Sequence, residues 1–204
     1  MFWDSVNHAI NSGAFYPPPY PVLVTGFPRS GTRFMVDVFQ DQGLRVGHEW
    51  IGKDGAVSWI HAVLNNSFDH TVHLVRHPLE AISSCQELGQ EVLDFMRIFI
   101  PVPEEAPEVI QWVYAWVEWN KMIEKRVSIR CRIEDIEEAL PGIFSLIGKK
   151  YTRRPLPFPD SGRKREYKML STEEIAARRE GPAALQLLDK KATEYGYTLQ
   201  EKSS

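Results

Sequence analysis

The chain has 204 residues, of which 43% are hydrophobic and 25% charged, with 6 Trp, 7 Tyr and 10 Phe. This apolar content is enough to build a core, so the composition excludes a globally disordered chain and predicts a single domain spanning residues 1–204. The formal net charge of −3 lacks the basic excess that non-specific nucleic-acid binding needs, so we expect no nucleic-acid partner.

Cysteine spacing and hydropathy predict a chain without structural crosslinks or membrane spans. Cys85 and Cys131 have neither CxxC nor Cys/His ligand spacing, which disfavours a disulfide framework and a zinc site. The longest stretch without charged residues, 5–28, contains prolines and glycines that a membrane-spanning helix would not tolerate. No basic segment precedes it, so we expect a cytoplasmic protein with no membrane partner.

Apolar periodicity predicts alternating helices and strands along the first part of the chain. Residues 1–20 form a lead-in segment that includes a short helix within 1–16. The elements expected after it are a buried strand at 22–25, a glycine loop at 26–31, a helix at 32–42, a strand at 44–46, a helix at 54–64 capped by Asp54, and a strand at 71–75.

The second part of the chain continues this alternation. Trp112, Trp116 and Trp119 lie on one stripe of the longest expected helix, which predicts that they belong to the core. Because strands alternate with helices, we expect an α/β fold with a mostly parallel central sheet flanked by helices. The further expected elements are helices at 78–88, 107–125 and 134–146, a strand at 127–131, a basic loop at 151–168 and C-terminal helices within 171–204.

The glycine loop at residues 26–33 reads Gly-Phe-Pro-Arg-Ser-Gly-Thr-Arg and joins the first expected strand to the next helix. In that context, glycine spacing of this kind is typical of a phosphate-binding loop. We expect the backbone amides of Ser30, Gly31 and Thr32 to face an anion, and Arg29 to add a full positive charge with two parallel donors. The alternative is a glycine turn that only joins a strand to a helix.

The loop departs from the ATP-binding pattern, because Thr32 and Arg33 stand where that pattern has lysine and a magnesium-binding hydroxyl. Its Pro-Arg-Ser-Gly-Thr stretch resembles the 5′-phosphosulfate loop of the sulfotransferase family. These enzymes take a sulfuryl group from 3′-phosphoadenosine-5′-phosphosulfate (PAPS) and have a P-loop nucleotide-hydrolase-like fold. The resemblance implies that residues 29–33 bind the phosphosulfate, although Arg33 replaces a usual Thr. Phe34 matches an often aromatic position that stacks on adenine, but core packing explains it equally.

A second motif follows the third expected strand. Arg76 comes directly after this strand, and Ser84 lies eight residues further on, about two helical turns into the next helix. This arrangement resembles the 3′-phosphate motif of the same family, which implies that both residues bind that phosphate. The alternatives are a surface ion pair for Arg76 and a helix-facing hydroxyl for Ser84. We interpret His77 and Ser83 as neighbours of the motif and not as ligands.

Positive charge gathers between residues 149 and 168. Within this stretch, Ser161-Gly162-Arg163-Lys164-Arg165 resembles the late basic loop that closes over the 3′-phosphate in the family, which implies that Arg163, Lys164 and Arg165 bind the nucleotide. The alternative is a solvated charged face. The basic residues are Lys149, Lys150, Arg153, Arg154, Arg163, Lys164, Arg165 and Lys168, against the acidic Asp160 and Glu166.

The candidate general base follows the second expected strand, in the segment Gly47-His48-Glu49. This segment resembles the Gly-Glu-Glu segment of the tyrosylprotein sulfotransferase branch, which implies that Glu49 is the base. Other branches use histidine, so His48 is a competing candidate, and a solvated loop pair is the alternative to both. If the base is a carboxylate, we expect turnover to fall on the acid side near or below pH ~5. If it is an imidazole, we expect that fall nearer pH ~6.5. Ser58 and Trp59 are candidates to line an acceptor pocket.

Together the motifs predict a PAPS-dependent sulfotransferase that moves a sulfuryl group to a hydroxyl of a small-molecule, glycan or peptide acceptor. Arg29 would stabilise the transferring group, and no metal ion is required in principle. Two alternatives stay open. One is a P-loop small-molecule kinase that uses ATP and magnesium, and the other is a non-catalytic nucleotide-binding protein of the same fold.

Overall fold

The computed structural model describes residues 2–12, 16–156 and 167–199. The chain divides into two compact units, and each is described by itself; the expectation of one domain stays a prediction. No helix in the described ranges is long and apolar enough to cross a membrane. The first unit comprises Met1–Val75 and Ile123–Lys164, and the second comprises Arg76–Met122 and Arg165–Ser204.

A five-stranded sheet forms the centre of the first unit. The strand order is β2-β3-β1-β4-β5, and all four pairings between neighbouring strands are parallel. This confirms the α/β class and the parallel sheet. The strands are β1 (Tyr20–Gly26), β2 (Val46–His48), β3 (Gly55–Val57), β4 (Phe68–Val75) and β5 (Ile129–Arg132).

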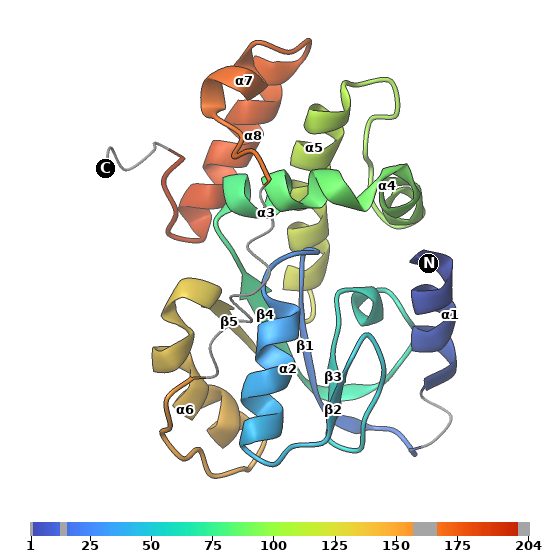
Figure 1. Ribbon diagram of the computed structural model, residues 1–204, viewed down its shortest axis with the longest axis vertical. Helices are drawn as coiled ribbons and strands as arrows, with labels where there is room; N and C mark the ends of the chain where they lie inside the picture. The colour runs from blue at the N-terminus through green and yellow to red at the C-terminus, as the bar shows by residue number, and fades with distance from the viewer. Residues whose placement is uncertain (1, 13–15, 157–166, 200–204) are drawn as a thin grey trace. The chain divides into compact units, whose positions relative to one another are not determined.

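Helices α2 and α6 cover one face of this sheet (Figure 1). Alternate residues of β1 point to opposite faces, so Val22 and Val24 join the core under α2 and α6, whereas Leu23 packs with Ile51 on the other face. The first unit contains the helices α1 (Phe2–Ser12), α2 (Thr32–Asp41) and α6 (Ile136–Leu146) and the short 3₁₀ turns η2 (Ile60–Ala62) and η4 (Ile133–Asp135).

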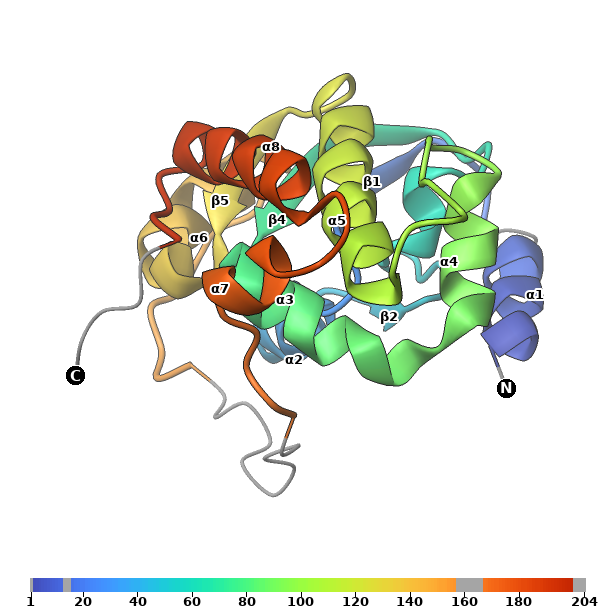
Figure 2. The same cartoon turned by 90° about the horizontal axis from the view of Figure 1, so that it is seen from above.

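The described part of the second unit is helical (Figure 2). Trp112, Trp116 and Trp119 of α5 are fully buried, as their spacing predicts. Ser171 caps α7, and its side chain and that of Glu174 form a capping box. Helix α4 has no counterpart among the predicted elements. The helices are α3 (Pro78–Cys85), η3 (Gln86–Leu88), α4 (Gln90–Arg97), α5 (Glu108–Glu124, whose last two residues belong to the first unit), α7 (Thr172–Ala176) and α8 (Gly181–Glu194).

The prediction of a helix at 54–64 is wrong, because this segment forms strand β3 and then the turn η2. Gly55 has φ +132°, and a Cβ there would lie 1.8 Å from the Val22 carbonyl oxygen, so only glycine allows β3 to approach β1 this closely. Asp54 does not cap a helix; its Oδ2 accepts a hydrogen bond of 2.8 Å from the Arg45 amide. The second strand also starts later than predicted, at Val46.

Candidate active site

The glycine loop lies between β1 and α2, as its sequence context predicts. A Cβ on Gly26 would lie 2.1 Å from the Leu74 carbonyl oxygen of the neighbouring strand, so this position requires glycine. The Ser30 amide donates a hydrogen bond of 3.1 Å to the Phe27 carbonyl. This amide is therefore engaged within the loop, contrary to the expectation that it faces an anion.

The amino terminus of α2 offers free donors directly after the loop. Its first helical hydrogen bond runs from the Met35 amide to the Gly31 carbonyl at 3.1 Å, so the amides of the three preceding helical residues have no partner inside the helix. No side chain caps this end. The Ser30 side chain is fully buried, and its Oγ has no hydrogen-bond partner among the described residues. An anion would satisfy both kinds of donor.

Two predicted catalytic residues have an unusual backbone conformation. Arg29 has φ 68° and Glu49 has φ 59°, and Glu180 is the third and last non-glycine residue with positive φ in the described ranges. Such a conformation costs about 1–3 kcal/mol in a non-glycine residue and is concentrated at functional sites. The coincidence with Arg29 and Glu49 supports a functional role for both.

The base segment lies at the carboxyl edge of the sheet, next to the start of α2. Glu49 follows the last residue of β2, and its Oε1 is 3.7 Å from His48 Nε2. The same His48 nitrogen is 3.4 Å from Thr32 Oγ1. The fold thus brings together two segments that the sequence singled out separately, the glycine loop and the candidate base.

Burial controls the protonation of both candidate bases. It raises the pKa of Glu49 to about 7, although hydrogen bonds from Ser58 and from the amides of Ile60 and Trp59 act in the opposite direction. Burial, and secondarily the charge of Arg33, lowers the pKa of His48 to about 4. At neutral pH His48 is therefore uncharged, and Glu49 exchanges its proton close to the working pH of a general base.

The positions that follow Thr32 have roles in the first unit besides ligand binding. Arg33 is exposed and acts electrostatically on His48, as its effect on the pKa of that imidazole shows. Phe34 is half-buried and packs against the hydrophobic core of this unit. The core interpretation of Phe34 therefore has direct support, and its stacking on adenine stays a prediction.

Arg76 and Ser84 belong to the second unit. Arg76 Nε donates a hydrogen bond of 2.9 Å to Glu80 Oε2, and its Nη2 is 2.7 Å from the same oxygen and 3.3 Å from the Tyr167 hydroxyl. The ion pair considered as the alternative for Arg76 is therefore present, with 26% of the arginine side chain exposed. Ser84 is buried within α3. Their binding of a 3′-phosphate stays a prediction.

The neighbours of this motif have structural partners. Ser83 Oγ donates a hydrogen bond of 2.5 Å to the Leu79 carbonyl and accepts one of 2.9 Å from the Leu170 amide. His77 Nε2 is 3.1 Å from the Thr198 carbonyl oxygen, and its ring packs edge-on against Tyr197. These contacts agree with the interpretation of His77 and Ser83 as neighbours.

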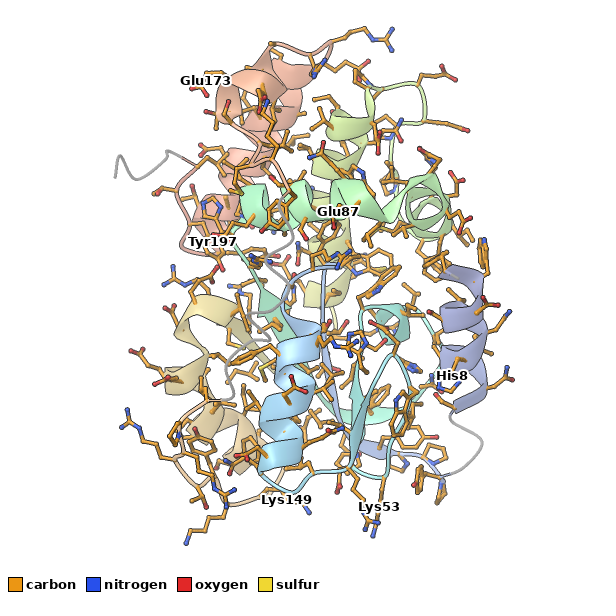
Figure 3. All side chains as sticks on the ribbon, viewed as in Figure 1. His8, Lys53, Glu87, Lys149, Glu173 and Tyr197 are labelled. Carbon is orange, nitrogen blue, oxygen red and sulfur yellow. The ribbon has the colours of Figure 1, made fainter. Side chains whose placement is uncertain are left out.

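The basic run, the positively charged stretch 149–168, is only partly described by the structure. Arg163, Lys164 and Arg165 lie outside the described residues. Lys149 Nζ is 3.8 Å from Asp54, which precedes β3, and Arg154 contacts Asp41 at the end of α2. Figure 3 shows the side chains of Lys149 and Lys53 at the same end of the first unit. This part of the run therefore lies at the amino edge of the sheet and does not face the glycine loop of its unit.

No group of three or more His, Cys, Asp or Glu side chains in the described part of the chain is arranged to hold a metal ion. No protein-family model matches the sequence, and no curated protein matches it. Among solved structures, the chain is similar to the mouse sulfotransferase SULT7A1 complexed with PAP (3′-phosphoadenosine-5′-phosphate), with a TM-score of 0.37 and 12% sequence identity. The match covers 72% of this chain and 65% of that chain, less than two thirds of its length. A likeness this distant assigns no role to any residue.

Proposed function

We propose that this chain is a PAPS-dependent sulfotransferase that acts on a hydroxyl acceptor. One observation carries the proposal. A buried carboxyl, Glu49, with its pKa raised to about 7 lies beside His48, and His48 in turn reaches Thr32 at the open amino terminus of α2. A proton acceptor and a site suited to an anion are thus neighbours, as sulfuryl transfer to a hydroxyl requires.

The glycine loop has the groups needed to hold the donor. PAPS, when bound, supplies the sulfuryl group, and it leaves as 3′-phosphoadenosine-5′-phosphate (PAP). The amide of Thr32 and the unpartnered Oγ of Ser30 would donate to its anionic oxygens, and Gly31 allows the chain to turn there with φ 95°. Arg29 would stabilise the negative charge that develops on the departing phosphate.

Glu49 would act on the acceptor. In its ionised form the carboxylate takes the proton from the acceptor hydroxyl, and burial favours the neutral carboxyl that results. The lowered pKa of His48, about 4, makes it a weaker proton acceptor than Glu49, so the proton goes to Glu49. In the second unit, Arg76 and Ser84 would bind the 3′-phosphate, and Arg76 would then share its guanidinium between Glu80 and the ligand.

We expect PAP to stabilise the protein against heat in the presence of EDTA, and ATP to do so only weakly. The reason is that PAP carries the 3′-phosphate, whereas ATP depends on the lysine and magnesium-binding hydroxyl that Thr32 and Arg33 replace. Ligand at about a hundred times its dissociation constant adds about 2.7 kcal/mol of stability. Thermal denaturation with PAP, ATP and ATP plus magnesium measures this. Equal stabilisation by ATP, or a strict magnesium requirement, would favour the kinase.

Replacing Arg76 by Ala should weaken PAP binding but leave adenosine 5′-phosphosulfate almost unaffected, because only PAP carries the 3′-phosphate. Loss of one charge-assisted hydrogen bond costs about 1.5–3 kcal/mol, or roughly a 10–150-fold change in dissociation constant. Calorimetric titration of both ligands tests this. Glu80→Gln is the matched control, since it removes the competing carboxylate and should preserve or tighten PAP binding. If Arg76→Ala weakens both ligands equally, Arg76 does not bind the 3′-phosphate.

A further inference from the structure

The turn after β3 encloses the carboxyl of Glu49. The Ser58 hydroxyl donates a short hydrogen bond to Glu49 Oε2, and the amides of Trp59 and Ile60 also donate to the carboxylate. Ser58 itself is fully buried, and only 13% of the Glu49 side chain is exposed. A carboxylate from the end of β2 is therefore held by three donors of the segment 58–60, and each of them favours the ionised form.

Ser58 connects the carboxyl to the turn. Its Oγ donates a hydrogen bond to Glu49 and accepts one of 3.1 Å from the amide of His61, which belongs to η2. Both bonds use one oxygen, so the hydroxyl proton must point at Glu49 while a lone pair receives the amide. This double engagement fixes the direction of the donor.

The electrostatic surroundings of Glu49 make the Ser58 hydroxyl important for the ionised form of the carboxylate. Among the described residues, no Lys or Arg charge contributes to the pKa of Glu49. The titratable group that faces it is His48 from β2, whose pKa is lowered to about 4, and the nearby charge of Arg33 from α2 acts on that imidazole. A buried carboxylate without a cationic partner depends on hydrogen bonds for its ionised form.

We propose that Ser58 is a positioning residue, which orients the Glu49 carboxylate and keeps its ionised form available in a buried site. The role of Glu49 as a base rests on the proposed function, whereas the contact between Ser58 and the carboxylate does not. In this proposal Ser58 acts through its hydrogen bond to the Glu49 carboxylate and takes no proton itself. The sequence suggested that Ser58 lines an acceptor pocket. In this proposal it holds the Glu49 carboxylate instead.

The test is a pH titration of the Glu49 carboxyl by carbon NMR in the full-length protein, with Glu49→Gln used to assign its signal. Ser58→Ala removes the hydroxyl and should raise the midpoint of this titration by about one to two pH units, the equivalent of one charge-assisted hydrogen bond. Ser58→Thr keeps the hydroxyl and should restore the wild-type midpoint. Ser58→Cys keeps the volume with a weak donor and should lie between them, which serves if the alanine variant does not fold.

The outcomes separate this proposal from the proposed function. An unchanged midpoint in Ser58→Ala, or a raised midpoint in Ser58→Thr equal to that of the alanine variant, overturns the role of Ser58. Where an acceptor is in hand, the acid limb of turnover should move upward with the midpoint in Ser58→Ala. If the midpoint moves but turnover keeps its wild-type acid limb, Ser58 holds the carboxyl and Glu49 is not the base.

Discussion

Replacing Glu49 by Gln is expected to lower turnover by roughly 10²–10⁴-fold, the usual contribution of a general base, while PAP binding persists. Glutamine keeps the size and the acceptor oxygen that Ser58 and the amides of Trp59 and Ile60 contact, but it cannot take a proton. Steady-state rates with a confirmed acceptor, together with calorimetric titration of PAP, measure the two effects separately.

The neighbouring histidine supplies the control. His48→Gln should cost much less than Glu49→Gln, because the lowered pKa of His48, about 4, makes its imidazole the weaker proton acceptor of the two. The pH profile gives a second criterion. Turnover should fall as the pH drops below about 7, since protonation then removes the Glu49 base. Turnover that persists down to about pH 4, combined with the larger loss in His48→Gln, would identify His48 as the base.

Replacing Arg29 by Ala should lower turnover by about 10²–10³-fold, because one preorganised donor to the developing charge contributes about that much. Arg29→Lys keeps the charge without the two parallel donors and should lose less. Arg29→Gly is the matched backbone control. Glycine accepts φ 68° without strain, so this variant should keep or gain thermal stability and still lose turnover.

Rates and melting temperatures of the three Arg29 variants distinguish charge from backbone. If Arg29→Gly retains near-normal turnover, the guanidinium is not needed and the positive φ alone explains the residue. If every variant melts far below the wild type, Arg29 is structural. Only loss of turnover in a stable Arg29→Gly protein fits an arginine that acts on the transferring group.

Apolar periodicity predicted most of the fold, including the strand and helix around the glycine loop and the buried tryptophan stripe of α5. It failed at β3. This strand has only three residues, all buried, so it shows no alternation of polar and apolar positions. What fixes it is the close approach of Gly55 to Val22, a tertiary contact that the sequence does not encode locally.

The sequence shows that His48 and Glu49 are adjacent, but it does not predict their protonation states. Ordinary pKa values predict that a carboxylate titrates below an imidazole, whereas burial reverses this order in the structure. The hydrogen bond from the His61 amide to Ser58 Oγ can be expected only once β3 is known to end before Ser58. The basic run shows the same limit, because only the fold separates Lys149 and Arg154 from the glycine loop.

The most direct test of the proposed activity is an analysis of the nucleotide products. The purified protein is given PAPS and ATP with magnesium together, plus a panel of small-molecule, glycan and peptide hydroxyl acceptors. We expect PAP to form with at least one acceptor and no ADP to form. In Glu49→Gln the rate of PAP formation should fall by roughly 10²–10⁴-fold. Formation of ADP would contradict this account in favour of a kinase. Absence of both products from a protein that binds PAP would contradict it in favour of a non-catalytic nucleotide-binding protein.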